Sequence, residues 1–125
     1  EANLSEANLS EANLTGVDLT GINLTGANLA GINLTGVNLL GANLAGVNLR
    51  AANLAGVDLR GANLSGVDLS GANLKGAILW GTVLFKANLT GVDMTGASMK
   101  GTNLDGALLC RTKMPSGRED NSGCK

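Results

Sequence analysis

The side chains that most often carry out catalysis are scarce in this chain of 125 residues. It has no His and no Tyr, and its ten Asp and Glu side chains are scattered along the sequence. Ser and Thr are frequent, but general acid–base or triad chemistry lacks its usual members. Glycines recur every five residues instead of lying between a strand and a helix, which argues against a phosphate-binding loop. The sequence therefore predicts a protein that is not an enzyme and binds no cofactor.

The two cysteines, Cys110 and Cys124, are the only thiols. Without a His or a further thiol, they are poor candidates for a zinc site. We expect them to form a disulfide, which would close a loop worth about 3 kcal/mol in the chain-entropy model. A disulfide implies an oxidising compartment, whereas reduced cysteines would indicate the cytoplasm.

A five-residue repeat positions these residues. From Glu1 to Cys110 the unit recurs twenty-two times without insertion: a small apolar residue, Asn or Asp, Leu, a variable residue and Gly, as in residues 62–66. The Leu is replaced only twice, by Met94 and Met99. On an α-helix, a Leu at every fifth position would leave no apolar face. In an extended segment the small residue and the Leu share one face, so the variable residue and Gly must turn a corner before the next unit.

The small inward residue alternates between Val and Ala in every unit from Val37 to Ala72. If each stacked column keeps one size, the number of sides per coil is even, and four corners close a square. We therefore predict twenty residues per coil and about 5.5 coils, stacked about 4.8 Å apart like parallel strands. Asn side chains twenty positions apart, such as Asn23 and Asn43, are expected to form amide ladders.

The tandem unit resembles that of the pentapeptide-repeat proteins over about nine-tenths of the chain. The resemblance implies an all-β fold, a right-handed quadrilateral β-helix. We expect residues 1–110 to form it and residues 111–125 to form a C-terminal capping tail. The ending from Cys110 through Met114, Pro115, Gly117 and Gly123-Cys124 is also similar to the C-terminal segment of cyanobacterial and plant-plastid members. Some of these lie in the thylakoid lumen, so the resemblance implies that lumen, or a periplasm, as the compartment.

The repeat changes in residues 77–85, where the outward residues become apolar. We expect an exposed interaction patch there, which flanks one corner of the coil. Its residues are Ile78, Trp80, Val83 and Phe85, together with Leu40, which would lie two coils above Trp80. On a twenty-residue coil, Arg60 and Lys100 would lie above and below Trp80, which makes a cation over the indole geometrically possible. Such clusters mark an interface or a covered surface. Two alternatives follow: the tail covers the patch, or the patch docks a partner protein or a second copy of the chain.

Glu1, Glu6 and Glu11 occupy corner positions that are Gly in later units. The repeat is in phase from residue 1, so no N-terminal cap and no signal peptide is visible. An uncapped coil would have unpaired backbone groups. We expect a segment missing from this sequence or a second molecule to cover this edge, and self-association through it is one possible interaction.

The formal net charge is −1, with 9 Lys and Arg against 10 Asp and Glu. This balance argues against nucleic acid as a partner, and no apolar run is long enough for membrane insertion. Some pentapeptide-repeat proteins imitate DNA and protect topoisomerases, but that mimicry needs a densely negative surface. A small-molecule or metal binder would need a pocket that a packed Leu core does not leave. The sequence therefore favours a structural or protein-interaction module whose partner is unknown.

Overall fold

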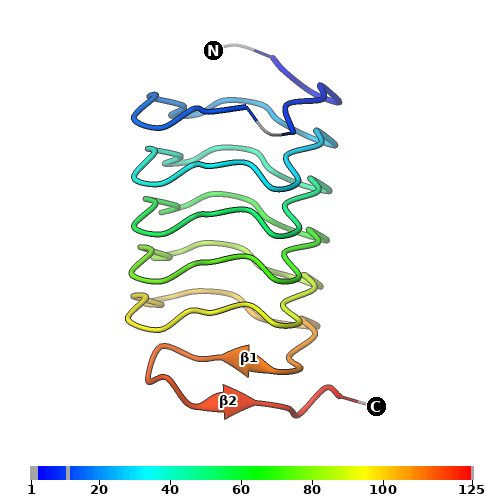
Figure 1. Cartoon of the computed structure of the whole chain (residues 1–125), viewed down its shortest axis with the longest axis vertical. Helices are drawn as coiled ribbons and strands as arrows, with labels where there is room; N and C mark the ends of the chain where they lie inside the picture. The colour runs from blue at the N-terminus through cyan, green and yellow to red at the C-terminus, as the bar shows by residue number, and fades with distance from the viewer. Residues whose placement is uncertain (1–2, 11, 125) are drawn as a thin grey trace.

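The computed structural model describes residues 3–10 and 12–124, which stack as successive coils along one axis (Figure 1). The residue at the Asn position of each unit forms a parallel bridge with the residue twenty positions later, from Asn3–Asn23 to Asp93–Lys113. One coil therefore takes four five-residue units, as the Val and Ala alternation predicts. The inward Leu side chains from Leu24 to Leu89 are at most 1% exposed, so they form one continuous core along the axis.

Regular strands are shorter than expected. Within the described residues only β1 (Thr112–Lys113) and β2 (Glu119–Asp120) are continuous strands, and they pair antiparallel. Each side of a coil contributes a single bridged residue between two turns. A three-residue side has room for only one bridge before the next corner interrupts the ladder, so the coils pair in parallel without forming extended sheets.

The backbone amides of one unit show how the coils hold together. In residues 41–45, three amides donate to adjacent coils: Gly41 to the Arg60 carbonyl (2.9 Å), Asn43 to that of Ile22 (2.9 Å) and Leu44 to that of Asn63 (2.8 Å). Ala42 donates to the Leu39 carbonyl across the turn, at 2.9 Å. Ala45 donates to the side-chain Oδ1 of Asn43, at 3.2 Å. Every amide of the unit is therefore paired, which is what a buried backbone requires.

Among the described residues, the Asn side chains do not form the expected amide ladders. Asn63 Oδ1 instead accepts from the backbone amide and the hydroxyl of Ser65, at 3.0 and 2.7 Å. Asp68 accepts from Ser70 in the same way, at 3.0 and 2.7 Å. This local Asx turn needs only one side-chain oxygen acceptor. The requirement explains why either Asn or Asp can occupy this position of the repeat.

Left-handed backbone marks the corners. Gly66 has a φ of 66°, and the same conformation recurs at the other corner glycines. Ala51 and Lys86 adopt it without being glycine, with a φ of 59° each. Glu6 and Arg111 do so as well, with φ of 60° and 50°. A side chain with a Cβ is disfavoured in this region, so these four corners are strained relative to the glycine corners.

Ala51→Gly is expected to raise the free energy of unfolding by about 1 kcal/mol, because the relief of left-handed strain exceeds the added entropy of the unfolded chain. Urea unfolding followed by circular dichroism measures the change. Ala55→Gly is the matched control: Ala55 lies at a variable position outside the left-handed region, so its replacement should destabilise the protein. Equal effects of the two variants would contradict the assignment of strain to Ala51.

The coil pattern continues five residues beyond the boundary expected at Cys110. Lys113 bridges Asp93, the Gly96 amide donates to the Pro115 carbonyl at 2.9 Å, and Thr112 is fully buried. The Thr112 hydroxyl donates to the Leu89 carbonyl at 2.7 Å. Residues 111–115 are therefore a degenerate further unit. The sequence signal that was missed is Thr at the small inward position, which Thr82 and Thr102 share, with equivalent bonds to the carbonyls of Leu59 and Leu79.

The chain reverses after this unit and closes the C-terminal end of the stack (Figure 1). The Met114 amide donates to the Arg118 carbonyl at 2.9 Å, and β2 returns alongside β1. The Gly123 amide donates to the Leu109 carbonyl at 2.8 Å, and Cys124 forms a disulfide with Cys110, their Cα atoms 4.9 Å apart. A Cβ at position 123 would lie 3.1 Å from the Leu109 carbonyl oxygen and 3.2 Å from the Leu109 amide nitrogen, so Gly favours this close approach.

Candidate functional site

The interaction patch lies across one side of the coil. Residues 80–81 and 85–86 are turns, so Trp80 and Phe85 stand at the two corners that bound the side formed by residues 82–84. The expectation that the patch flanks a single corner is therefore wrong. Trp80 is 44% exposed and Phe85 41% exposed, while Val83 lies half-buried between them. The result is an apolar band across a surface whose other outward positions are mostly polar.

The remaining patch residues extend this band around and along the rod. Ile78 is half-buried on the preceding side of the same coil. Leu40, which is 36% exposed, lies two coils toward the N-terminal end, in the corner column of Trp80. Arg60 occupies the coil between Leu40 and Trp80. The Gly41 amide donates to the Arg60 carbonyl, and the Gly61 amide donates to the Trp80 carbonyl. Leu40 is thus separated from the band by a charged residue.

The Trp80 indole is held between two cations. Arg60 Cζ lies 5.9 Å from the ring centroid and Lys100 Nζ lies 5.8 Å from it, on coils above and below. The indole Nε1 donates to Ser98 Oγ. At the other corner, Lys86 Nζ lies 5.2 Å from the Phe85 ring centroid. Cation–π contacts and the indole hydrogen bond fix the orientation of the rings, so the surface is preorganised for binding.

Asp58 fixes the upper cation of this stack. Arg60 Nη2 lies 2.7 Å from Asp58 Oδ2, and Arg60 Nε lies 2.9 Å from Asp58 Oδ1. These hydrogen bonds lower the pKa of Asp58 against the opposing effect of partial burial, and they raise the pKa of Arg60. The ion pair with Asp58 therefore partly neutralises the charge of Arg60 and orients its guanidinium toward the indole of Trp80.

The C-terminal tail does not cover the patch, so that alternative is wrong. Its contacts are with the last units instead: Gly123 with Leu109, Arg111 with Asn121, and Cys124 with Cys110. The residues that the tail contacts stack on the sides formed by residues 87–89 and 92–94. The patch residues 78–85 lie on the two preceding sides of the coil. The exposed fractions of Trp80 and Phe85 are measured with the tail in place.

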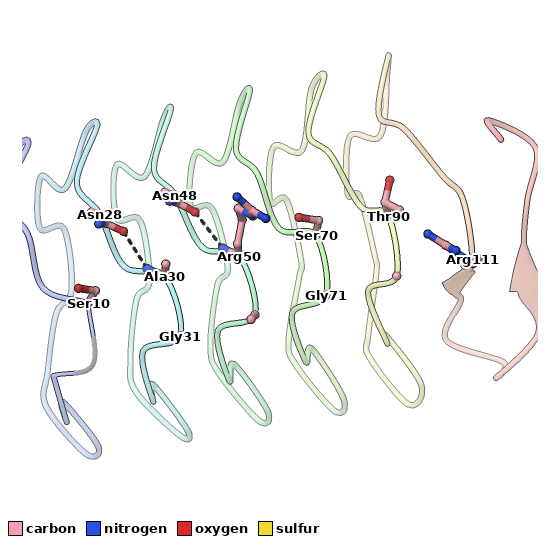
Figure 2. Close-up of a pocket in the computed structure, with 12 residues that line it drawn as sticks. Ser10, Asn28, Ala30, Gly31, Asn48, Arg50, Ser70, Gly71, Thr90 and Arg111 are labelled. Carbon is pink, nitrogen blue, oxygen red and sulfur yellow. Dashed lines mark hydrogen bonds between the residues drawn. The ribbon is translucent and has the colours of Figure 1, made fainter. Parts of the chain in front are cut away.

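An open groove runs along a different corner (Figure 2). Small residues twenty positions apart form its floor, and Arg50 and Arg111 project beside it; the lining includes Ser10, Ala30, Gly31, Ser70, Gly71, Thr90 and Gly91. Arg50 Nε lies 3.8 Å from Asp68 Oδ2, so this cation has a partner within the chain. The expectation that no pocket exists rested on the packed Leu core alone. The missed signal was a corner column with few large side chains.

Several carboxylates have lowered pKa values. The hydroxyl of Thr95, and then its backbone amide, lower the pKa of Asp93, as Arg60 does that of Asp58. A carboxyl whose pKa is lower in the folded state than in the unfolded state stabilises the fold above its unfolded pKa of about 3.9. That stabilisation is lost as the pH falls through the folded pKa.

The free energy of unfolding is therefore expected to fall as the pH is lowered from about 5 to about 2. The double variant Asp58→Asn, Asp93→Asn should show a weaker pH dependence, because Asn keeps the Oδ1 acceptor of the turn and does not titrate. Thermal unfolding at a series of pH values measures both proteins. An unchanged pH dependence in the double variant would exclude these two carboxylates as its source.

The inward side chains of the first coil are more accessible than those of the central coils. Leu4 is 37% exposed and Val17 40% exposed, although both occupy inward repeat positions. Glu6 is an exposed corner residue, whereas Glu1 and Glu11 lie outside the described residues.

Residues 3–10 and 12–124 contain neither a cluster of metal ligands nor a membrane-spanning helix. No group of three or more His, Cys, Asp or Glu side chains there could hold a metal ion. That part of the chain contains no helix with the length and apolarity needed to cross a bilayer.

Comparison with known proteins bears on the whole chain. The family described as Pentapeptide repeats (8 copies) matches residues 2–41, 42–81 and 81–114. Among solved structures, a pentapeptide repeat protein from the Arabidopsis thaliana thylakoid lumen is 27% identical, with a TM-score of 0.59 over 94% of this chain and 83% of that one. Rfr23, a pentapeptide repeat protein from the cyanobacterium Cyanothece, is 30% identical, with a TM-score of 0.58 over 84% of this chain and 82% of its own.

A third similar structure is longer than this chain. HetL, a pentapeptide repeat protein involved in heterocyst differentiation regulation in the cyanobacterium Nostoc, is 34% identical over 95% of this chain, with a TM-score of 0.44. The chain spans 62% of HetL. No curated protein matches the chain by sequence.

Proposed function

Because the chain belongs to the pentapeptide-repeat family, whose members are generally structural or interaction modules, we propose that it is a non-enzymatic protein-interaction module. In this proposal a right-handed, four-sided rod holds the patch of Ile78, Trp80, Val83, Phe85 and Leu40 at fixed spacing, and a partner protein binds there. The observation that carries the proposal is the exposure of the only two aromatic residues, Trp80 and Phe85, on one side of one coil. Exposed Trp is the side chain most often found at binding hot spots.

The topoisomerase-protecting alternative has less support. A DNA mimic needs acidic side chains in dense, unbroken arrays. Here three of the aspartates, Asp58, Asp68 and Asp93, lie within 4 Å of Arg60, Arg50 and Lys75 respectively. In the column of bridged residues that contains Asp58, its two neighbours are Asn38 and Ile78, neither of which is charged. Paired and interrupted charges of this kind do not imitate a duplex.

We also propose that the protein works in an oxidising compartment, the thylakoid lumen or a periplasm. The disulfide between Cys110 and Cys124 supports an oxidising environment. The similarity to a thylakoid-lumen protein from Arabidopsis thaliana supports the lumen in particular. Fractionation of the native cells with an antibody against the protein tests this proposal, and recovery in the cytoplasm with both thiols reduced would reject it.

The interaction proposal is tested by capture from the native extract. Immobilised wild-type protein should retain a partner, and Trp80→Ser should retain at least tenfold less, since a hot-spot Trp contributes about 2 kcal/mol or more. Arg50→Ser is the matched control, because Arg50 occupies the same repeat position beside the groove. Circular dichroism checks that each variant is folded. Loss of capture with Arg50→Ser but not with Trp80→Ser would move the site to the groove.

A further inference from the structure

The charges around the patch indicate what kind of partner it accepts. Arg60, Lys86 and Lys100 all lie at cation–π distance from its two rings. Arg60 is paired with Asp58, whereas Lys86 and Lys100 form no ion pair among the described residues. The apolar band therefore has one unpaired ammonium group beside each of its two aromatic ends.

We propose that the partner binds through an extended acidic segment, with an apolar side chain flanked by carboxylates two residues away on each side. This inference rests on the proposed function, because it names the chemistry of the partner of the same patch. The apolar side chain contacts Val83 between the two rings, and the carboxylates lie against Lys100 and Lys86.

The spacing of an extended chain fits this arrangement. In such a segment alternate residues point to the same side, and the first and fifth residues are about 13 Å apart. Lys86 lies at the corner after residues 82–84, and Lys100 lies one coil further on, in the column of the corner before them. Their long, flexible side chains can reach carboxylates at that separation. A central apolar side chain then faces Val83, which is half-buried between the projecting Trp80 and Phe85 rings.

The orientation of the indole argues against a nucleic acid or a sugar as the ligand. Single-stranded nucleic acids bind by stacking their bases on free aromatic faces. Arg60 and Lys100 lie on coils on either side of the Trp80 ring, and the indole Nε1 is already bonded to Ser98. The ring therefore offers its edge, which makes van der Waals contact with an apolar side chain but gives no stacking platform.

The acidic residues near the patch argue against an anionic membrane. Asp105 lies on the coil next to Lys86, whose amide donates to the Asp105 carbonyl at 2.8 Å. Asp58 lies beside Arg60 at the other corner. A uniformly negative surface would approach these carboxylates together with the cations, and like charges repel. A peptide can place its carboxylates against the lysines alone, so the pattern favours a protein segment.

A synthetic peptide tests the inference, since Trp80 is the only Trp and reports on its own site. A peptide of about nine residues that alternates Glu and Leu should shift the Trp80 emission to the blue as its indole edge is covered. A peptide with Lys in place of every Glu should bind at least tenfold more weakly. The double variant Lys86→Gln, Lys100→Gln should also lose tenfold in affinity for the acidic peptide, whereas Lys75→Gln, on another corner, should not.

Three results would overturn the inference. They are equal binding of the acidic and basic peptides, stronger binding to phosphatidylglycerol vesicles than to the acidic peptide, and no emission change up to millimolar acidic peptide. Capture from the native extract separates this failure from that of the proposed function. If capture depends on Trp80 but not on Lys86 and Lys100, the patch is an interaction site and the acidic segment is wrong. If capture does not depend on Trp80, the proposed function itself is wrong.

Discussion

Leu64→Ala should lower the free energy of unfolding by about 3 kcal/mol or more, within the range measured for buried Leu to Ala changes. Leu64 is fully buried at the middle of the rod. Its equivalents twenty residues away, Leu44 and Leu84, are fully buried as well. The hydrogen bonds that join successive coils hold the backbone in place, so the walls cannot collapse into the space left by the missing atoms. Urea unfolding followed by circular dichroism measures the loss.

Leu4→Ala is the matched control for this prediction. Leu4 occupies the same repeat position but is 37% exposed in the first coil. Removing its side chain leaves a smaller cavity and loses less burial, so the expected cost is below about 1 kcal/mol. Similar costs for the two variants would contradict a core whose packing depends on position along the rod.

Reduction of the disulfide between Cys110 and Cys124 is the second large expected effect. The bond closes a loop with a sequence separation of 14 residues, and its loss should cost about 3 kcal/mol in the chain-entropy model. Residues 116–124 are otherwise held by the pairing of β2 with β1, by the Gly123 amide bonded to the Leu109 carbonyl, and by Asn121 Oδ1, which accepts from the Arg111 amide. Urea unfolding with and without a reductant measures the change.

The location of the damage can be predicted as well. In a repeat protein each unit contacts mainly its neighbours, so a lost terminal contact need not spread along the rod. We expect amide hydrogen exchange to rise at Gly123 and Met114 after reduction, and to stay slow at Leu64. The double variant Cys110→Ala, Cys124→Ala should be unaffected by reductant. Uniformly faster exchange along the whole chain would show that the disulfide stabilises more than the tail.

Much of the architecture could be predicted because the repeat is strict. A five-residue period excludes a helix, and the alternation of Val and Ala between Val37 and Ala72 indicates four sides. The twenty-residue register followed, and with it the stack of Arg60, Trp80 and Lys100. These inferences depend on equivalent residues occupying equivalent places, which is the property that a repeat guarantees.

The features that were mispredicted all involve a choice between alternative contacts. An Asn side chain can bond to a stacked amide or to the backbone two residues later, and both are compatible with the period. The local turn prevails because it pairs the amide of the variable residue, which has no carbonyl partner in the adjacent coil. The change of composition after Cys110 predicts a tail that includes Thr112, although its hydroxyl bond repeats that of Thr82.

The tail could not be placed from the sequence for a different reason. Its path depends on the turn between β1 and β2, which directs residues 119–124 back along the end of the rod. The disulfide and the close approach of Gly123 then hold it on the sides away from the patch. None of these contacts repeats, so no period in the sequence indicates them.

The twenty-residue register also determines how such a protein can change in evolution. Duplication of a single five-residue unit between Arg60 and Trp80 would rotate everything after it by a quarter turn and separate the indole from Arg60. Duplication of four consecutive units would instead shift the same residues along the rod by one layer without rotation. Insertions in multiples of four units can therefore lengthen the rod and keep the same side chains on the same side. Insertions of any other number of units bring existing surface residues into new combinations.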